Sequence, residues 1–191
     1  MISGSRYKVL IADPPWEYRN NTARGGAGRH YPTMSLSELC SLPVRDLADE
    51  DSILFLWTTW PQLPEAQELI RAWGFTYKTG LPWIKTQIDI QEDPERGLLW
   101  APRMGNGFWL RGCSEAILLA YRGKVKPPAP EDRLLGLLAP TVKHSRKPES
   151  LHLLAERMSP GPYLELFARE RRPGWDVFGN EVESSISLAE A

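Results

Sequence analysis

The sequence predicts an α/β fold, in which a sheet is covered by helices on both faces. Apolar runs typical of buried strands alternate with segments whose apolar residues recur every three or four positions, as in amphipathic helices. Residues 53–57 are apolar without interruption, which is typical of a strand covered on both faces in a mostly parallel sheet. At 191 residues, the chain has the length of one domain.

The first half of the chain is expected to alternate strand and helix. Val9-Leu10-Ile11 is a short apolar strand, and Ser35-Leu36-Ser37-Glu38 has the capping-box pattern that begins a short helix. Residues 52–59 form the next strand. Pro61 begins a helix that Gly74 ends. The inward-facing stripe of this helix consists of Leu63, Ala66, Leu69, Ile70 and Trp73.

The chain after Gly74 contributes four more strands and one helix. We expect strands at residues 75–85, interrupted near Gly80-Leu81-Pro82, and at residues 114–121. Two further strands are expected at residues 163–168 and 175–178. Between the strands at residues 114–121 and 163–168, Pro148 suits the first turn of a helix. The residues of this helix that face inward are Leu151, Leu154, Ala155 and Met158.

Long segments without periodicity separate these elements. Residues 17–31 are polar and rich in Gly and Arg, which favours a mobile substrate loop. Residues 86–112 form a second long loop, and residues 124–140 are rich in Pro. We expect a single domain over residues 1–182, followed by a flexible acidic tail at 183–191.

The composition is that of a soluble protein, with 42% hydrophobic and 25% charged residues. The sequence has no apolar run of ~18 residues and no signal peptide, so we expect a cytoplasmic protein without a membrane span. Cys40 and Cys113 lie far apart and outside any Cys-x-x-Cys pattern. We therefore expect neither a structural metal nor a disulfide framework.

The net charge of −1 hides an uneven distribution. Residues 1–95 carry 9 Lys and Arg against 13 Asp and Glu, whereas residues 96–172 carry 14 against 7. A local basic excess is the electrostatic pattern of a protein that binds a polyanion such as nucleic acid. The alternative is a solvated surface with scattered basic residues.

The stretch Asp13-Pro14-Pro15-Trp16 follows the first strand directly. The Asp13 carboxylate and the Pro14 carbonyl can accept the two hydrogens of an exocyclic amino group, while Trp16 offers a face on which a base can stack. Two acceptors favour a more tetrahedral amino nitrogen, which is then better able to attack a methyl group. The alternative is a rigid strand-to-loop turn, since Asp and Pro are common turn residues.

This stretch resembles the signature of amino-methyltransferases, and its Asp-Pro-Pro-Trp form resembles the MT-A family of adenine-N6 methyltransferases. The resemblance implies a Rossmann-like methyltransferase fold with a circularly permuted motif order and S-adenosylmethionine as cofactor. Tyr31-Pro32-Thr33-Met34 resembles the family's gate beside the active site, and His144 to Glu149 its Ser-His-Lys-Pro helix start. Residues 163–169 also form a strand that runs into a basic loop, where doubly wound folds bind nucleotides.

The resemblance assigns roles to individual residues. Those that it places at the cofactor are Asp13, Lys147, Glu165, Phe167, Arg169, Asn180 and Glu181. Tyr31, Arg29 and Glu115 are expected to bind the substrate, and Asp13, Pro14, Pro15 and Trp16 are the catalytic residues. Glu181 stands where the family often has Gln.

The function expected from the sequence is methyl transfer to the N6 amino group of adenine in nucleic acid, with DNA favoured over RNA. A duplex substrate would have to present the base flipped out. One alternative is a non-catalytic nucleic-acid-binding or partner subunit on the same fold. The other alternative is methylation of cytosine N4 or of a small-molecule amine. Assembly as a homodimer or with a partner subunit is a further possibility.

Overall fold

The structure is a computed structural model that describes residues 6–17, 32–86, 91–93, 97–99, 109–110, 112–141 and 146–188. The strands are β1 (Tyr7–Ala12), β2 (Ala48–Thr58), β3 (Thr76–Thr86), β4 (Gln91–Asp93), β5 (Gly97–Leu99), β6 (Ser114–Arg122), β7 (Leu137–Pro140), β8 (Tyr163–Leu166) and β9 (Trp175–Phe178). The helices are α1 (Leu36–Ser41), α2 (Val44–Leu47), α3 (Leu63–Ala72) and α4 (Ser150–Met158), with the 3-10 turns η2 (Trp60–Gln62) and η3 (Pro130–Asp132).

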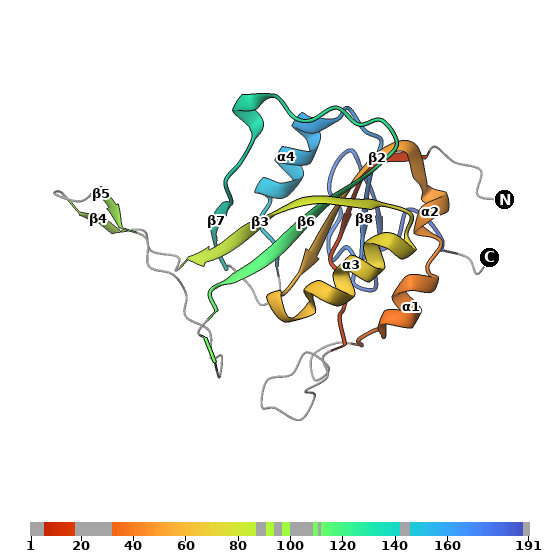
Figure 1. Cartoon of the computed structure of the whole chain (residues 1–191), viewed down its shortest axis with the longest axis horizontal. Coiled ribbons are helices and arrows are strands. Elements are labelled where there is room, and N and C mark those ends of the chain that lie inside the picture. Colours follow the sequence, from red (N-terminus) through yellow and green to blue (C-terminus); the bar gives the residue numbers. More distant parts are fainter. Residues whose placement is uncertain are drawn as a thin grey trace.

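A twisted sheet with the strand order β7-β3-β6-β2-β1-β8-β9 forms the centre of the molecule (Figure 1). β1 pairs in parallel with β2 and with β8, and β8 pairs in parallel with β9. β6 runs antiparallel to both of its neighbours, β2 and β3. The predicted α/β class with a mostly parallel sheet is therefore confirmed.

Helices cover both faces of the sheet (Figure 1). On one face, Leu10 and Leu54 pack with Leu69 and Trp73 of the α3 region, together with residues of α1 and α2. On the other face, alternate residues of the same strands pack against Leu151, Leu154 and Ala155 of α4. β1 and β2 are thus buried on both sides, as expected for strands at the centre of a parallel sheet.

Local signals in the sequence account for several helix ends. The Ser35 hydroxyl accepts a hydrogen bond from the backbone N–H of Glu38, whose carboxylate accepts the N–H of Ser35, which completes the predicted capping box. Gly74 follows α3 with a φ of +80°, a conformation in which Gly has no Cβ to obstruct the turn. The stripe predicted for α3 faces the core.

The prediction of an interruption in the third strand is wrong. β3 continues through Gly80, Leu81 and Pro82, and its register shift lies between Tyr77 and Thr79. Pro82 is tolerated because the N–H of Lys85 points toward β6, so alternation along the strand turns the nitrogen of Pro82 the other way. β7 pairs with β3 only from Trp83 onward, so no ladder hydrogen bond is lost.

Several elements were not anticipated. β7 and η3 lie within the segment that was expected to be a proline-rich excursion, and β4 and β5 form a small hairpin within the expected second loop. After β9, the Ser185 N–H donates to the Val177 carbonyl at 2.8 Å, and Ile186 and Leu188 pack against the core. The part of the tail up to Leu188 therefore has specific contacts, while its expected flexibility stays a prediction.

Candidate active site

Two adjoining pockets, of about 420 and 460 Å³, lie where β1 and β8 end. Asp13, Lys147, Phe167 and Arg169 line both of them. The first pocket is also lined by Pro14, Pro15, Trp16, Pro32, Thr58, Thr59, Glu115, Ala168, Asn180 and Glu181. The second is also lined by Pro140, Arg146, Pro148, Glu149, His152, Glu165, Glu170, Arg171, Arg172 and Pro173. The carboxyl ends of parallel strands are the usual location of a ligand site in such sheets.

The Asp-Pro-Pro-Trp stretch leaves β1 as a rigid, hydrogen-bonded loop. The backbone N–H of Trp16 donates to the Pro14 carbonyl at 2.8 Å, and the backbone N–H of Met34 donates to the Pro15 carbonyl at 2.9 Å. Glu17 N–H in turn donates to the Met34 carbonyl. A carbonyl oxygen has two lone pairs, so Pro14 keeps one acceptor position for a ligand.

Trp16 lies at the pocket but is mostly enclosed by protein. Its side chain is 6% exposed and packs in the core, and its indole N–H donates to the Trp57 carbonyl at 3.2 Å. The ring therefore forms part of the pocket wall and supports the loop. The open stacking face that the sequence led us to expect is reduced to a small area.

Asp13, Lys147 and Glu115 line the first pocket and form a chain of alternating charges that Lys85 extends beyond the pocket. The Lys147 ammonium lies 2.9 Å from Oδ2 of Asp13 and 3.2 Å from Oε2 of Glu115. Lys85 binds the other carboxylate oxygen of Glu115. The Lys147 ammonium also lies 5.3 Å from the centre of the Trp57 ring, within the range of a cation–π contact.

Burial and pairing act on the pKa values of this cluster in opposite directions. Burial raises the pKa of Asp13 above its ordinary value, although Lys147 opposes the shift. Burial disfavours the charged forms of Glu115 and Lys147 too, but their partners outweigh it. The pKa of Glu115 is consequently lowered by Lys147 and Lys85, and the pKa of Lys147 is raised by Asp13 and Glu115.

The backbone after β8 is folded tightly around the pockets. Phe167, which lines both pockets, has a φ of 62°, an uncommon conformation for a bulky residue. A Cβ on Gly179 would lie 1.9 Å from the Ala168 carbonyl oxygen, so only Gly permits this approach of two segments. The approach places Asn180 and Glu181 on the wall of the first pocket, where Glu181 pairs with Arg169 at 3.4 Å.

Glu165 is held from the helix side of the second pocket. Nε2 of His152, on α4, lies 2.9 Å from Oε2 of Glu165. The His152 ring packs edge-on against Trp175, with 4.9 Å between ring centres. Its Nδ1 is buried and has no hydrogen-bond partner within the described part of the chain.

The structure brings together most of the residues that the sequence placed at the site. Asp13, Pro14, Pro15, Trp16, Glu115, Lys147, Phe167, Arg169, Asn180 and Glu181 line the first pocket, and Glu165 lines the second. Tyr31, Arg29 and His144 lie outside the described residues. Their roles stay predictions.

Sequence reasoning missed Lys85, His152 and the pair Thr58 and Thr59. Lys85 reaches Glu115 only through the antiparallel register of β3 and β6, in which Trp83 lies opposite Glu115. His152 follows Leu151 on the inward side of α4, a position at which a polar residue was a usable signal. Thr58 and Thr59 directly follow the apolar run of β2 and were passed over as the end of a strand.

Comparison with known proteins decides the family. Residues 7–181 match the MT-A70 family. The chain belongs to that family. The type II methyltransferase M.MunI of a Mycoplasma species is 30% identical over 198 residues, which cover 93% of this chain and 78% of M.MunI.

Two further relatives with similar sequences come from animals. The human N(6)-adenosine-methyltransferase catalytic subunit METTL3 is 28% identical over 93% of this chain and 28% of its own length. The mouse N(6)-adenine-specific methyltransferase METTL4 is 28% identical over 94% of this chain and 38% of its own length. The chain thus spans a minor part of both METTL proteins.

The described residues of this MT-A70 protein contain neither a candidate metal centre nor a candidate membrane-spanning helix. No group of three or more His, Cys, Asp or Glu residues among them is placed to hold a metal ion. No helix among them is long and apolar enough to cross a membrane.

Proposed function

We propose that this MT-A70 protein transfers a methyl group from S-adenosylmethionine to the N6 amino group of adenine in nucleic acid. The observation that carries the proposal is the position of Asp13. Its carboxylate belongs to both pockets, so it lies between a space for one ligand and a space for another. A transfer reaction between two bound molecules needs a polar group at such a junction.

The residues present fit the proposed cofactor. Each pocket has a volume suited to a small organic ligand. The second pocket offers Arg146, Lys147 and Arg169 for a carboxylate and Glu165 for ribose hydroxyls or an ammonium group. His152, whose Nε2 lies 2.9 Å from Oε2 of Glu165, holds this carboxylate at the same wall. Lys147, Glu165 and Arg169 line this pocket and would hold the cofactor, and Asn180, on the wall of the first pocket, would reach it where the two pockets meet.

The first pocket is the proposed position of the target base. There, the Asp13 carboxylate and the free lone pair of the Pro14 carbonyl accept the two hydrogens of the adenine amino group. When bound, S-adenosylmethionine supplies an electrophilic methyl group whose carbon–sulfur bond breaks as the amino nitrogen attacks. Asp13 orients that nitrogen through its hydrogens, and neither a metal ion nor a covalent enzyme intermediate is required.

Proton removal is a second task for Asp13. The amino nitrogen must lose a proton after it gains the methyl group, and Asp13 is the carboxylate next to it in the proposed arrangement. Burial raises the pKa of Asp13, which makes its carboxylate a better proton acceptor than an exposed one. The nearby Lys147 ammonium opposes the effect of burial on the pKa of Asp13 and so favours its ionised form.

The charge distribution of the chain bears on the substrate. The basic excess of residues 96–172 supports a polyanion as substrate. We propose DNA as the favoured polymer, with the target base flipped out of a duplex substrate. Assembly as a homodimer or with a partner subunit and a cytoplasmic location also stay proposals. The paired carboxylates and lysines at the first pocket favour catalysis over a purely binding role.

The direct test supplies labelled S-adenosylmethionine with single-stranded and duplex DNA and RNA, followed by digestion and identification of the labelled nucleoside. We expect labelled N6-methyladenine with the wild type and none with Asp13→Asn, which preserves size. Asp132→Asn is the matched control, because Asp132 pairs with Arg157 and lines neither pocket. Label on cytosine, or full activity of Asp13→Asn, would refute the proposal. No label despite cofactor binding would favour a non-catalytic subunit or an absent partner.

A further inference from the structure

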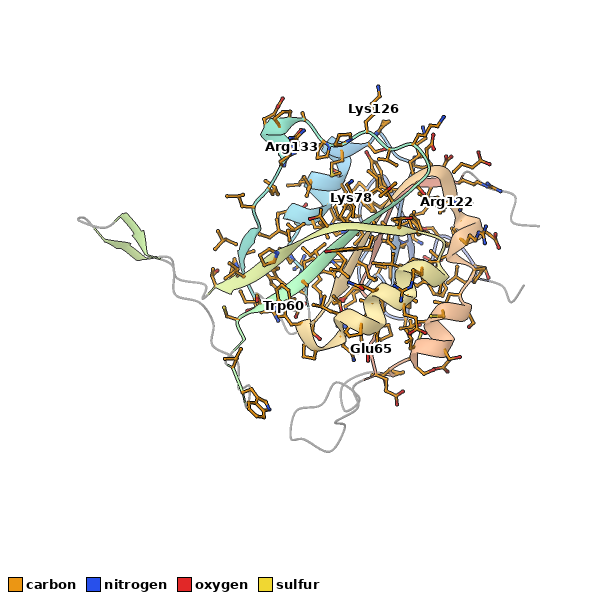
Figure 2. The ribbon with its side chains drawn as sticks, viewed as in Figure 1. Trp60, Glu65, Lys78, Arg122, Lys126 and Arg133 are labelled. Atoms are coloured by element: carbon orange, nitrogen blue, oxygen red, sulfur yellow. The ribbon has the colours of Figure 1, made fainter. Side chains whose placement is uncertain are left out.

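Trp60 is a large aromatic residue that the proposed reaction leaves without a role. It begins η2, directly after β2, and its side chain is 47% exposed. Figure 2 shows Trp60 where β2 ends, away from Arg122 at the opposite end of β6. An indole of this size left open to water is a candidate contact for a ligand.

The Trp60 ring is held in place by its polar atom. The indole N–H donates to the Ser114 hydroxyl on β6 at 2.9 Å. η2 is also tied to the Asp-Pro-Pro-Trp loop, since the amide of Gln62 donates to the Glu17 carbonyl at 2.9 Å. Because the hydrogen bond to Ser114 holds the ring and the Gln62 contact anchors η2, the ring loses little further freedom when a ligand binds to its exposed face.

The neighbours of Trp60 place it at the rim of the first pocket. Thr58 and Thr59, the two residues before it, line that pocket. Trp16 inside the pocket is 6% exposed, so Trp60 offers far more open aromatic surface beside the proposed position of the target base.

We propose that Trp60 is a stacking platform for the base adjoining the target adenine. The inference rests on the proposed function, because it takes a single-stranded or locally opened nucleic acid as the occupant. A base has an apolar π face that can stack on an exposed indole. The platform keeps the neighbouring nucleotide in place while the target base occupies the first pocket.

The chain provides its own comparison for an exposed aromatic without this role. Tyr77 is 43% exposed and pairs with Ala120, near the far end of β3 and β6 from Ser114. Tyr77→Ala therefore removes a similar exposed ring remote from both pockets. Trp60→Phe keeps a stacking face but loses the hydrogen bond to Ser114.

The experiment measures the affinity of each variant for a fluorescein-labelled single-stranded oligonucleotide that contains one adenine, as DNA and as RNA, with S-adenosylhomocysteine present. We expect Trp60→Ala to weaken binding of the preferred polymer by roughly ten-fold to one-hundred-fold, and Trp60→Phe by less. Tyr77→Ala should leave the affinity unchanged. Affinity for S-adenosylhomocysteine and the unfolding temperature, measured for all variants, establish that the fold and the cofactor site are intact.

A second oligonucleotide series identifies the base that stacks. An abasic nucleotide placed on either side of the adenine should weaken wild-type binding at one of the two positions. At that position, Trp60→Ala should cause no further loss, because the contact is already absent. Equal affinities of Trp60→Ala and Tyr77→Ala, purely additive losses, or a wild type that binds neither polymer would overturn the inference. Failure of the proposed function is a different result, namely binding without methyl transfer by the wild type.

Discussion

The Lys147 ammonium lies 2.9 Å from Oδ2 of Asp13, joining the segment before α4 to the loop after β1. The same ammonium reaches Glu115 at 3.2 Å. One cation thus connects the proposed catalytic carboxylate to a second carboxylate that Lys85 also binds. The charge on Asp13 therefore depends on residues from three separate parts of the chain.

Replacing Lys147 by Met should raise the pKa of Asp13 further, because burial already raises it and Lys147 is the main opposing influence. A protonated Asp13 is a weaker hydrogen-bond acceptor for the amino group and cannot take up the proton that the amino nitrogen releases. We expect the acid limb of the rate against pH to move to higher pH and the rate at neutral pH to fall about 100-fold or more. Lys147→Arg should restore part of the profile. An unchanged acid limb in Lys147→Met would contradict this account.

Glu115→Gln should change how the stability of the protein depends on pH. The folded pKa of Glu115 is lowered, so its ionised form stabilises the folded state above the ordinary value of 4.5, and this contribution disappears as pH falls through the folded pKa. The free energy of unfolding of the wild type should decline over that acidic range, and that of Glu115→Gln should decline less. Urea titrations at a series of acidic pH values test this. Parallel curves would contradict it.

His152→Ala should impair cofactor binding more than the chemical step. The His152 ring orients the Glu165 carboxylate at 2.9 Å but lines only the second pocket. We expect the KM for S-adenosylmethionine to rise several-fold with a small change in kcat, as for a group that acts on binding alone. His152→Gln should recover part of the loss, since its amide can donate to Glu165. Leu153→Ala, at an exposed neighbouring position, is the control.

Gly179→Ala should destabilise the fold and disturb the pocket wall. The added Cβ would lie 1.9 Å from the Ala168 carbonyl oxygen, and the backbone must shift to admit it. We expect a loss of about 1–3 kcal/mol in unfolding free energy, together with weaker cofactor binding through Asn180. Gly112→Ala is the matched control, because its Cβ would meet no atom within 4 Å. Equal stability of the two variants in thermal melts would refute the packing argument.

Features encoded by neighbouring residues could be predicted from the sequence. The strand at Val9, the capping box at Ser35 and the helix end at Gly74 each depend on a few adjacent side chains. The Asp13-Pro14-Pro15-Trp16 stretch was recognisable for the same reason. Only the family resemblance placed Asp13 and Lys147 at one site, because no local signal joins positions so far apart, and their direct ion pair was not predicted.

Features that depend on pairing between distant segments could not be predicted. β7 is a strand because β3 offers it an edge, and its own sequence, Leu-Leu-Ala-Pro, carries little strand signal. Lys85 meets Glu115 because of the β3–β6 register. The burial of Trp16 likewise follows from how β2 and Met34 pack around its loop.

The contacts of the tail with β9 have a practical consequence for anyone who handles this protein. The Ser184 hydroxyl accepts the N–H of Gly179, and Ser185 exchanges hydrogen bonds with Val177. Asn180 and Glu181 lie on the short loop between these anchor points and form pocket wall. If the chain were ended after Glu183 and an affinity tag attached there, Ser184 and Ser185 would be lost and the loop released. A protein tagged in this way would bind its cofactor poorly and could be mistaken for an inactive one.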